Sequence, residues 1–294
     1  MANVFEIDHL RTWIGNQDTG TDTLTPELLK RFRAMLDGYT ELGPQVPLGI
    51  HWCLAQPAVN NEGLGVDGHP AKGAFLPPVP LPQRMWASSR VKFHKPLRVG
   101  VPIGRTSTIA DVISKQSAAS GTLVFVHIDH TFTQDNETLI EEKQVIVYRH
   151  FSALKQAEPA PRSLAQTSNR LPQSAGRTLN ILPNSTLLFR YSGMTFNGHR
   201  IHYDHTYATT QEGYPGLVVQ GPLMATLLMN LAQASRPQNV LQAFEFRGVA
   251  PTFVDQPFKV AVLDDGAESL EIRNHDNDLV MSASAEFERT ELTS

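Results

Sequence analysis

Residues 196–204, FNGHRIHYD, place two histidines, an asparagine, an arginine and an aspartate within nine positions. Histidine is the side chain here that exchanges a proton near neutral pH, because its unperturbed pKa is about 6.5. An asparagine cannot act as a general base, but its amide can orient a water or hold a carbonyl by hydrogen bonds. The stretch is therefore either an acid–base site or a polar turn, for which Asn197-Gly198 is itself a signal.

A predicted helix begins shortly after this stretch. Gly221 and Pro222 open an apolar run over residues 221–235, GPLMATLLMNLAQAS. Proline fits the first helical turn, where its missing N–H costs nothing, and glycine lets a ligand approach the backbone closely. The unpaired N–H groups and the dipole of a helix N-terminus favour negative charge, such as that on a developing enolate oxygen. The two features predict a polar site assembled against a helix N-terminus.

The elements that must position this site follow a pattern that occurs twice. Apolar residues cover nearly the whole circumference of 221–235, which predicts a helix buried on most sides. In the first half the helical candidates are residues 25–38 and 50–55, and TLLFRYSG, residues 186–193, is predicted as a strand. The later segments of each half alternate apolar and polar residues, as half-buried antiparallel strands do. VKFHKPLRVG and FEFRGVAPTFVDQP both run from a strand through a proline into a turn, as repeat counterparts would.

This repeat predicts an α+β protein in which each half is a helix wrapped by an antiparallel sheet. Residues 154–176 are rich in Ala, Pro, Ser and Gln and have no sustained apolar period, which predicts a linker. The expected units are therefore residues 1–153 and residues 177–294.

Composition narrows the function classes. The 294 residues carry 25 Lys and Arg against 29 Asp and Glu and show no basic stripe, which argues against a nucleic-acid partner. Cys53 is the only cysteine, which excludes an intramolecular disulfide and a cysteine-rich metal site. His127 and Asp129 would face one side of a strand and His130 the other, so no metal site is expected there. The absence of a signal peptide pattern and of an 18-residue apolar run predicts a cytoplasmic protein without a membrane partner.

The second half resembles a known family. FNGHRIHYD, followed by YA and GYPGLVVQGPL, is similar to the MaoC-type hotdog-fold R-specific enoyl-thioester hydratases and dehydratases. Within them it is most similar to the mesaconyl-C4-CoA and itaconyl-CoA hydratases and the hydroxyacyl-thioester dehydratase type 2 proteins. PLGIHWCLA and GVDGHPAKGAFLPPVPLPQRMWASSR in the first half resemble the same group, so the resemblance spans about Trp13 to Phe287. It implies a double hotdog whose residues 1–153 bind substrate and whose residues 177–294 carry catalysis.

The resemblance also implies roles for individual residues. The family motif is an Asp followed five positions later by a catalytic His, with an oxyanion-binding Gly at the central helix. Alignment places these roles at Asn197, His202 and Gly221. Asn197 departs from the usual Asp, and Gln220 stands where the family commonly has His, although the FNGH form recurs in the mesaconyl-type and type 2 dehydratase members. General acid–base catalysis would then depend on His202.

Further residues are assigned more loosely. Asp204 either assists His202 or caps the following helix. His199 is expected to serve the turn or to support the site from behind, because it would share a face with His202 only in a helical loop. Other residues could bind the substrate because they are polar groups near the motif or could pair with a carboxylate or a CoA phosphate. These candidates are Arg200, Tyr203, Gln220 and Arg247.

The implied activity is reversible hydration of an enoyl-CoA thioester, most of all a branched short-chain dicarboxylic one such as mesaconyl-C4-CoA or itaconyl-CoA. Two alternatives stay open: a 3-hydroxyacyl-ACP dehydratase of fatty-acid synthesis, and a non-catalytic acyl-thioester binding protein that the change at Asn197 would explain. The only expected partner besides the acyl-CoA substrate is a second copy of the chain. A chain with two hotdog units could be a monomer or a homodimer. No cofactor is expected beyond the coenzyme A of the substrate.

Overall fold

The computed structural model describes residues 6–117, 121–150 and 176–288. The strands are β1 (Gln17–Thr23), β2 (Gln83–Phe93), β3 (Pro102–Ser117), β4 (Gly121–Gln134), β5 (Glu137–Arg149), β6 (Thr178–Ile181), β7 (Leu241–Gly248), β8 (Phe258–Val262), β9 (Ser269–Asn274) and β10 (Leu279–Phe287). The helices are α1 (Ile7–Arg11), α2 (Pro26–Leu36), α3 (Ser185–Met194), α4 (His205–Thr210) and α5 (Gly221–Ser235), with short 3₁₀ helices η1 (Ile50–Cys53), η2 (Asn61–Gly63) and η3 (Arg200–His202). No helix within the described ranges is both long and apolar enough to cross a membrane.

All ten strands form one antiparallel sheet that repeats the same plan twice. The order is β1-β3-β4-β5-β2-β7-β10-β9-β8-β6, so each strand of the first half has a counterpart at the equivalent place in the second. The central strands β2 and β7 pair antiparallel, with Ser89 opposite Phe246 and Val91 opposite Phe244. These strands contain the starts of the two segments predicted to be repeat counterparts, so the duplication is confirmed in the topology. The predicted linker, residues 154–176, lies outside the described residues except for Gly176.

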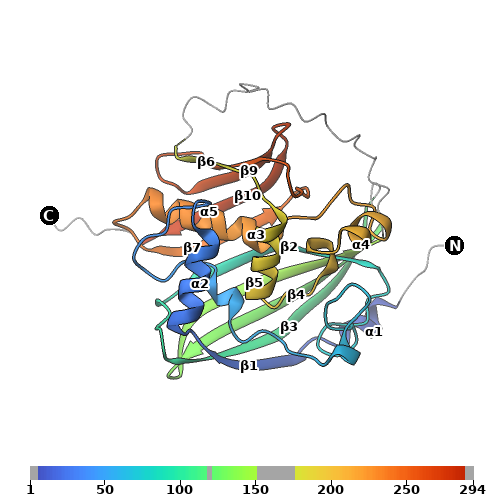
Figure 1. The fold of residues 1–294 in the computed structure, drawn as a ribbon. Helices are drawn as coiled ribbons and strands as arrows, with labels where there is room; N and C mark the ends of the chain where they lie inside the picture. The colour runs from blue at the N-terminus through green and yellow to red at the C-terminus, as the bar shows by residue number, and fades with distance from the viewer. Residues whose placement is uncertain (1–5, 118–120, 151–175, 289–294) are drawn as a thin grey trace.

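Helix α5 is the central helix of the second half and has the predicted bounds, 221–235. Its residues from Pro222 to Ala232 are all buried, and it contacts β7, β8, β9 and β10. In Figure 1 the strands of the second half curve around it. Its one buried amide, Asn230, is paired with the backbone N–H and C=O of Leu48 in the first half. A helix enclosed in this way has no solvent face, which accounts for apolar residues around its circumference.

The described part of the first half contains no second long wrapped helix. Its α2 has eleven residues, buries Phe32, Met35 and Leu36, and packs against α3. The place between α2 and β2, where the second half has α5, is taken by η1 and a long irregular segment. Residues 54–82 contain six prolines and four glycines, and prolines remove backbone donors and disfavour helix in the residue before them. The predicted helix at 50–55 is accordingly limited to the 3₁₀ turn η1.

The strand predicted at 186–193 is wrong, because these residues belong to α3. Asn184 caps this helix by accepting a hydrogen bond from the Leu187 N–H at 2.8 Å. Its buried residues, Leu187, Leu188, Tyr191 and Ser192, follow helical and not alternating spacing. An asparagine cap before an apolar pair was therefore the signal that the strand prediction overlooked.

Candidate active site

The motif stretch forms a tight turn that leads from α3 into η3. The Asn197 N–H donates to the Ser192 carbonyl at 2.9 Å, and the Asn197 Oδ1 accepts from the His199 N–H at 3.0 Å. Asn197 therefore closes a side-chain turn, as Asn in an Asn-Gly pair commonly does. Side chains three residues apart eclipse in a 3₁₀ helix, and η3 follows directly on His199. As a result the His199 and His202 rings meet edge to face, with centroids 5.5 Å apart.

His202 is held as a neutral imidazole with one nitrogen available. Its side chain is 7% exposed, and its Nδ1 donates to the Val218 carbonyl at 2.7 Å. That bond fixes the tautomer in which Nε2 carries the lone pair. Nε2 makes no hydrogen bond to any described residue. Burial, followed by the positive charge that His199 carries when protonated, lowers the pKa of His202 to about 3, against a small rise from the Val218 bond. The site therefore contains a base that is ready at neutral pH.

The low pKa of His202 predicts how stability changes with pH. The unfolded chain has the ordinary pKa of 6.5, and the folded chain a pKa of about 3. The contribution of this group is complete above pH 6.5 and is lost as the pH falls toward 3, because the unfolded state binds the proton first. In the wild type this group should make the free energy of unfolding fall by up to about 1.4 kcal/mol for each pH unit below 6.5. His202→Gln should lack this slope. Urea unfolding of both proteins between pH 7.5 and 4.5 measures the difference, and parallel curves would contradict it.

The segment before α5 brings the start of that helix to His202. The Val218 N–H donates to the Ile201 carbonyl at 3.0 Å, and the Val219 N–H donates to the Thr252 carbonyl at 2.9 Å. Gly221 is three positions after Val218, a span of at most about 11 Å. The N–H of Gly221 has no acceptor among the described residues. A Cβ at Gly221 would come no closer than 3.9 Å to its nearest neighbour, so the backbone here is open to a ligand.

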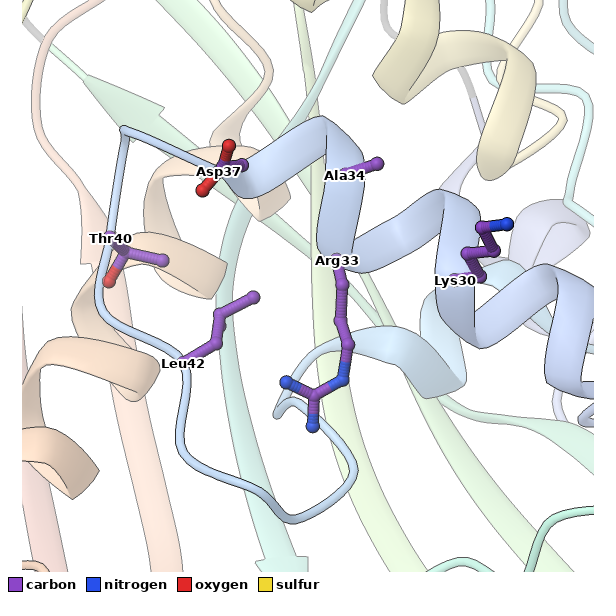
Figure 2. A pocket seen from close by; sticks show the side chains of 6 residues that line it. All are labelled: Lys30, Arg33, Ala34, Asp37, Thr40 and Leu42. Carbon is purple, nitrogen blue, oxygen red and sulfur yellow. The ribbon is translucent and has the colours of Figure 1, made fainter.

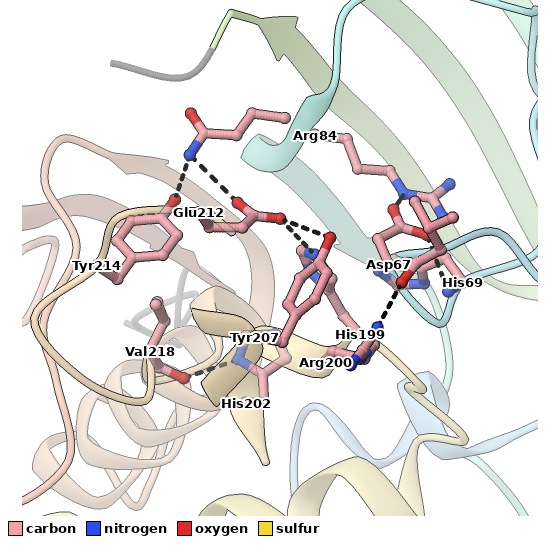
Figure 3. A network of polar contacts seen from close by, with 12 residues as sticks. Asp67, His69, Arg84, His199, Arg200, His202, Tyr207, Glu212, Tyr214 and Val218 are labelled. Carbon is pink, nitrogen blue, oxygen red and sulfur yellow. Dashed lines mark hydrogen bonds and ion pairs between the residues drawn. The ribbon is translucent and has the colours of Figure 1, made fainter. Parts of the chain in front are cut away.

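A loop from the first half closes directly against the motif turn. The Arg200 N–H donates to the Asp67 carbonyl at 2.9 Å, and Gly68 and Gly198 lie backbone to backbone. Arg84 on β2 holds this loop through two hydrogen bonds to the Asp67 carboxylate, at 2.8 and 3.1 Å. The ring of His69 lies 4.7 Å from that of His199 (Figure 3). The first half therefore shapes the turn that carries His202, in addition to the substrate-binding role that the sequence predicts for it.

A buried carboxylate, Glu212, completes this polar cluster. It is 3% exposed, and its Oε1 lies 3.6 Å from the His199 Nε2. The Tyr207 hydroxyl donates to Oε1 at 3.4 Å, and the Gln83 amide donates to Oε2 at 3.2 Å. The sequence pattern did not identify Glu212, and it assigned His199 a turn or supporting role. If a 3₁₀ turn had been expected here, the three-residue spacing of His199 and His202 would have indicated that the two rings meet.

Asp204, Arg200 and Tyr203 are engaged with the turn itself. Asp204 caps α4 by accepting from the Tyr207 N–H at 2.9 Å, and it pairs with Arg200 at 2.8 Å. The bond from the Tyr207 N–H contributes most to lowering the pKa of the Asp204 carboxyl, and the bond from Arg200 lowers it further. The imidazole of His202 is oriented by Val218, so of the two roles predicted for Asp204 the structure shows the helix cap. Tyr203 is 46% exposed and donates to the Gly198 carbonyl at 2.8 Å.

Gln220 and Arg247 are the two candidates that lie apart from the cluster. Gln220 is fully buried, and its amide donates to the Leu188 carbonyl at 2.8 Å and to Ser192 Oγ at 3.0 Å. It ties α3 to the start of α5. Arg247 is exposed, next to the buried Phe246, and so lies on the outer face of β7. The contact with a substrate carboxylate or a CoA phosphate expected of Arg247 stays a prediction.

A hollow of about 430 Å³ lies elsewhere, between α2 and the loop that follows it (Figure 2). Lys30, Arg33 and Asp37 are among its lining residues. The Arg33 guanidinium donates to the carbonyls of residues 43 and 44 and is not free for an anion. None of the lining residues belongs to the motif turn or to α5. Within the described ranges, no group of three or more His, Cys, Asp or Glu residues is arranged to hold a metal ion.

Comparison with known proteins shows which family the chain belongs to. The family model for hydroxyacyl-thioester dehydratase type 2 matches residues 49–254, which include the first-half loop, the motif turn and α5. The chain is 42% identical to the mesaconyl-C(4)-CoA hydratase of Chloroflexus aurantiacus over 281 residues, 94% of this chain and 96% of that protein. The chain belongs to the hydroxyacyl-thioester dehydratase type 2 family. The relationship inferred from FNGHRIHYD is thereby confirmed.

Solved structures agree on the fold. HtdX of Mycobacterium tuberculosis has a TM-score of 0.65 at 14% identity, with 92% of this chain and 98% of that chain covered. A second protein of that organism, described as a double hotdog fold, has a TM-score of 0.58 at 11% identity, with 96% and 98% covered. The predicted α+β double hotdog is confirmed, with α5 as its long wrapped helix.

Proposed function

We propose that this family member is a hydro-lyase that reversibly adds water to the double bond of an α,β-unsaturated CoA thioester. The observation that carries the proposal is the His202 ring, which is held with Nε2 free by the carbonyl of Val218, three positions before the start of α5. Acid–base work on water needs a base that is unprotonated at neutral pH, and burial provides it here. The N–H of Gly221 supplies a donor where negative charge would develop.

The proposed hydration begins when His202 Nε2 takes a proton from water as the oxygen bonds to the β-carbon. Negative charge moves to the thioester oxygen, which accepts a hydrogen bond from the Gly221 N–H and gains from the α5 dipole. A positioned base contributes about 10²- to 10⁴-fold, and one oxyanion donor about 10²- to 10³-fold. Residues of the chain itself supply both groups, so the proposal requires no cofactor beyond the coenzyme A of the substrate.

The proposed substrate is a branched short-chain dicarboxylic enoyl-CoA, with mesaconyl-C4-CoA and itaconyl-CoA as the first candidates. Its support is the 42% identity with a mesaconyl-C(4)-CoA hydratase over nearly the full length of both chains. A 3-hydroxyacyl-ACP dehydratase is the second candidate, because the matching family is described as a hydroxyacyl-thioester dehydratase. A cytoplasmic location and a homodimer stay predictions.

The test is a panel of enoyl thioesters followed by the loss of their ultraviolet absorbance on hydration. The panel contains mesaconyl-C4-CoA, itaconyl-CoA, an unbranched enoyl-CoA without the terminal carboxylate, and the same unbranched acyl group on acyl carrier protein. We expect the highest kcat/KM with a dicarboxylic CoA thioester. Preference for the carrier-protein thioester would favour the dehydratase of fatty-acid synthesis. Tight binding without turnover of any thioester would leave the non-catalytic binding protein as the function and overturn the proposal.

A further inference from the structure

Hydration of an enoyl thioester involves two proton transfers at different atoms. One proton leaves the water that bonds to the β-carbon, and one proton arrives at the α-carbon. His202 offers one available nitrogen, Nε2, because its Nδ1 is bound to the Val218 carbonyl. Asn197 cannot exchange a proton, and its Oδ1 is already used by the His199 N–H. The second proton transfer therefore needs another group beside His202 that can carry a proton.

His199 is the titratable group in ring contact with His202. The two centroids are 5.5 Å apart at an interplanar angle of 88°, so the edge of one ring meets the face of the other. His199 is 5% exposed, and its ring also lies against that of His69 from the first half. The turn at Asn197 and the 3₁₀ helix η3 fix this arrangement from both sides. The two imidazoles therefore stand next to one another in the motif turn.

Glu212 places a carboxylate beside the ring of His199. A buried carboxylate is costly unless a positive group or several donors face it. Its hydrogen-bond donors, Tyr207 and Gln83, are both uncharged, while the His199 Nε2 lies 3.6 Å from Oε1. Burial and the charge of Glu212 raise the pKa of Tyr207 to about 12, so the hydroxyl stays a donor. Among these three partners, His199 is the one that can bring a positive charge.

The two histidines are placed in opposite electrostatic surroundings. His202 faces a carbonyl and the other imidazole, and the positive charge on His199 is one of the causes that lower its pKa. His199 faces the Glu212 carboxylate. A carboxylate thus faces one imidazole and a carbonyl faces the other, a difference in partners that suits one group to act as acid and the other as base. The other charged or titratable groups around the pair are Asp67, His69, Arg84, Arg149, Arg200, Tyr207 and Tyr214.

We infer that His199, paired with Glu212, is the second acid–base group of the site and delivers the proton to the α-carbon. This inference rests on the proposed function. In hydration, His202 takes a proton from water, the water oxygen bonds to the β-carbon, and the double-bond electrons move toward the thioester. Protonated His199 gives its proton to the α-carbon, and the proton on His202 returns to His199 through solvent. Glu212 acts through His199 and is a positioning residue.

The experiment compares Glu212→Gln and Glu212→Asp with wild type, with Glu268→Gln as a control that removes a largely exposed carboxylate. Removing the negative charge favours loss of the proton from His199. We expect Glu212→Gln to move the alkaline limb of the kcat/KM profile for hydration down by about one to three pH units. Glu212→Asp should restore most of that shift, and Glu268→Gln should leave the profile unchanged. A loss of kcat with an unmoved alkaline limb would assign Glu212 a structural role and overturn the inference.

Two further measurements separate this inference from the proposed function. NMR titration of the histidine rings, which needs no turnover, should show the His199 transition at lower pH in Glu212→Gln than in wild type. An equal transition would overturn the pairing even in an active enzyme. His199→Gln should lower kcat about 100-fold or more while its circular dichroism matches wild type. Full activity in His199→Gln would overturn the inference alone, whereas a wild type without turnover on any thioester would overturn the proposed function and the inference with it.

Discussion

His202→Gln should reduce kcat by about 10²- to 10⁴-fold, the range that a positioned acid–base group contributes. Glutamine can keep the hydrogen bond that His202 donates to the Val218 carbonyl, so the loop before α5 stays in place. Its amide cannot accept and release a proton near neutral pH. The loss should therefore fall on kcat, with KM for the thioester changed little. Steady-state kinetics with the best substrate of the panel measures both parameters.

A matched control for this variant is His205→Ala. His205 lies on α4 three residues beyond His202, and its side chain is exposed. It has no part in the cluster around Val218, so its activity should equal that of wild type. The circular dichroism spectrum of His202→Gln should also be unchanged. If His202→Gln turned over the substrate at the wild-type rate, the base assignment would be refuted and another group would have to activate the water.

Much of the site could be predicted from local sequence. The GPL start and the apolar circumference of α5 predicted its bounds, and the predicted approach of His202 to the start of α5 agrees with its bond to Val218, three positions before Gly221. The same logic failed for α3, because its apolar pair was interpreted as strand alternation although Asn184 stood at the cap.

Other parts depend on contacts between distant segments. Glu212 follows His202 by ten residues in an irregular stretch, and only the folded chain brings it to His199. The first-half loop around Gly68 reaches the motif turn because Arg84 on β2 holds Asp67. No periodicity in either segment encodes this meeting. A glycine in a turn signals a backbone conformation, but not that another glycine will lie against it.

This contact makes Gly68→Ala the substitution in the first half with the largest expected effect on catalysis. A Cβ at Gly68 would lie 2.0 Å from the Gly198 carbonyl oxygen, and its φ of +84° is itself unfavourable for alanine. A carbonyl of the backbone cannot turn aside as a flexible side chain can. The loop of Asp67 and His69 must therefore move away from the motif turn, and His199 loses the ring that lies against it. We expect a loss of kcat of at least tenfold together with a lower free energy of unfolding, since misplacement of about 1 Å in a catalytic site can cost about 100-fold.

Gly73→Ala separates the close approach from the backbone conformation. Gly73 also has a positive φ, +102°, but a Cβ there meets nothing closer than Pro78 Cβ at 3.8 Å. Alanine in the left-handed region costs about 1–2 kcal/mol, so both variants should lose that much stability. Only Gly68→Ala should also lose kcat, measured where both proteins remain folded. Equal kcat values in the two variants would show that the first-half loop does not position the motif turn, and catalysis would then depend on the second half alone.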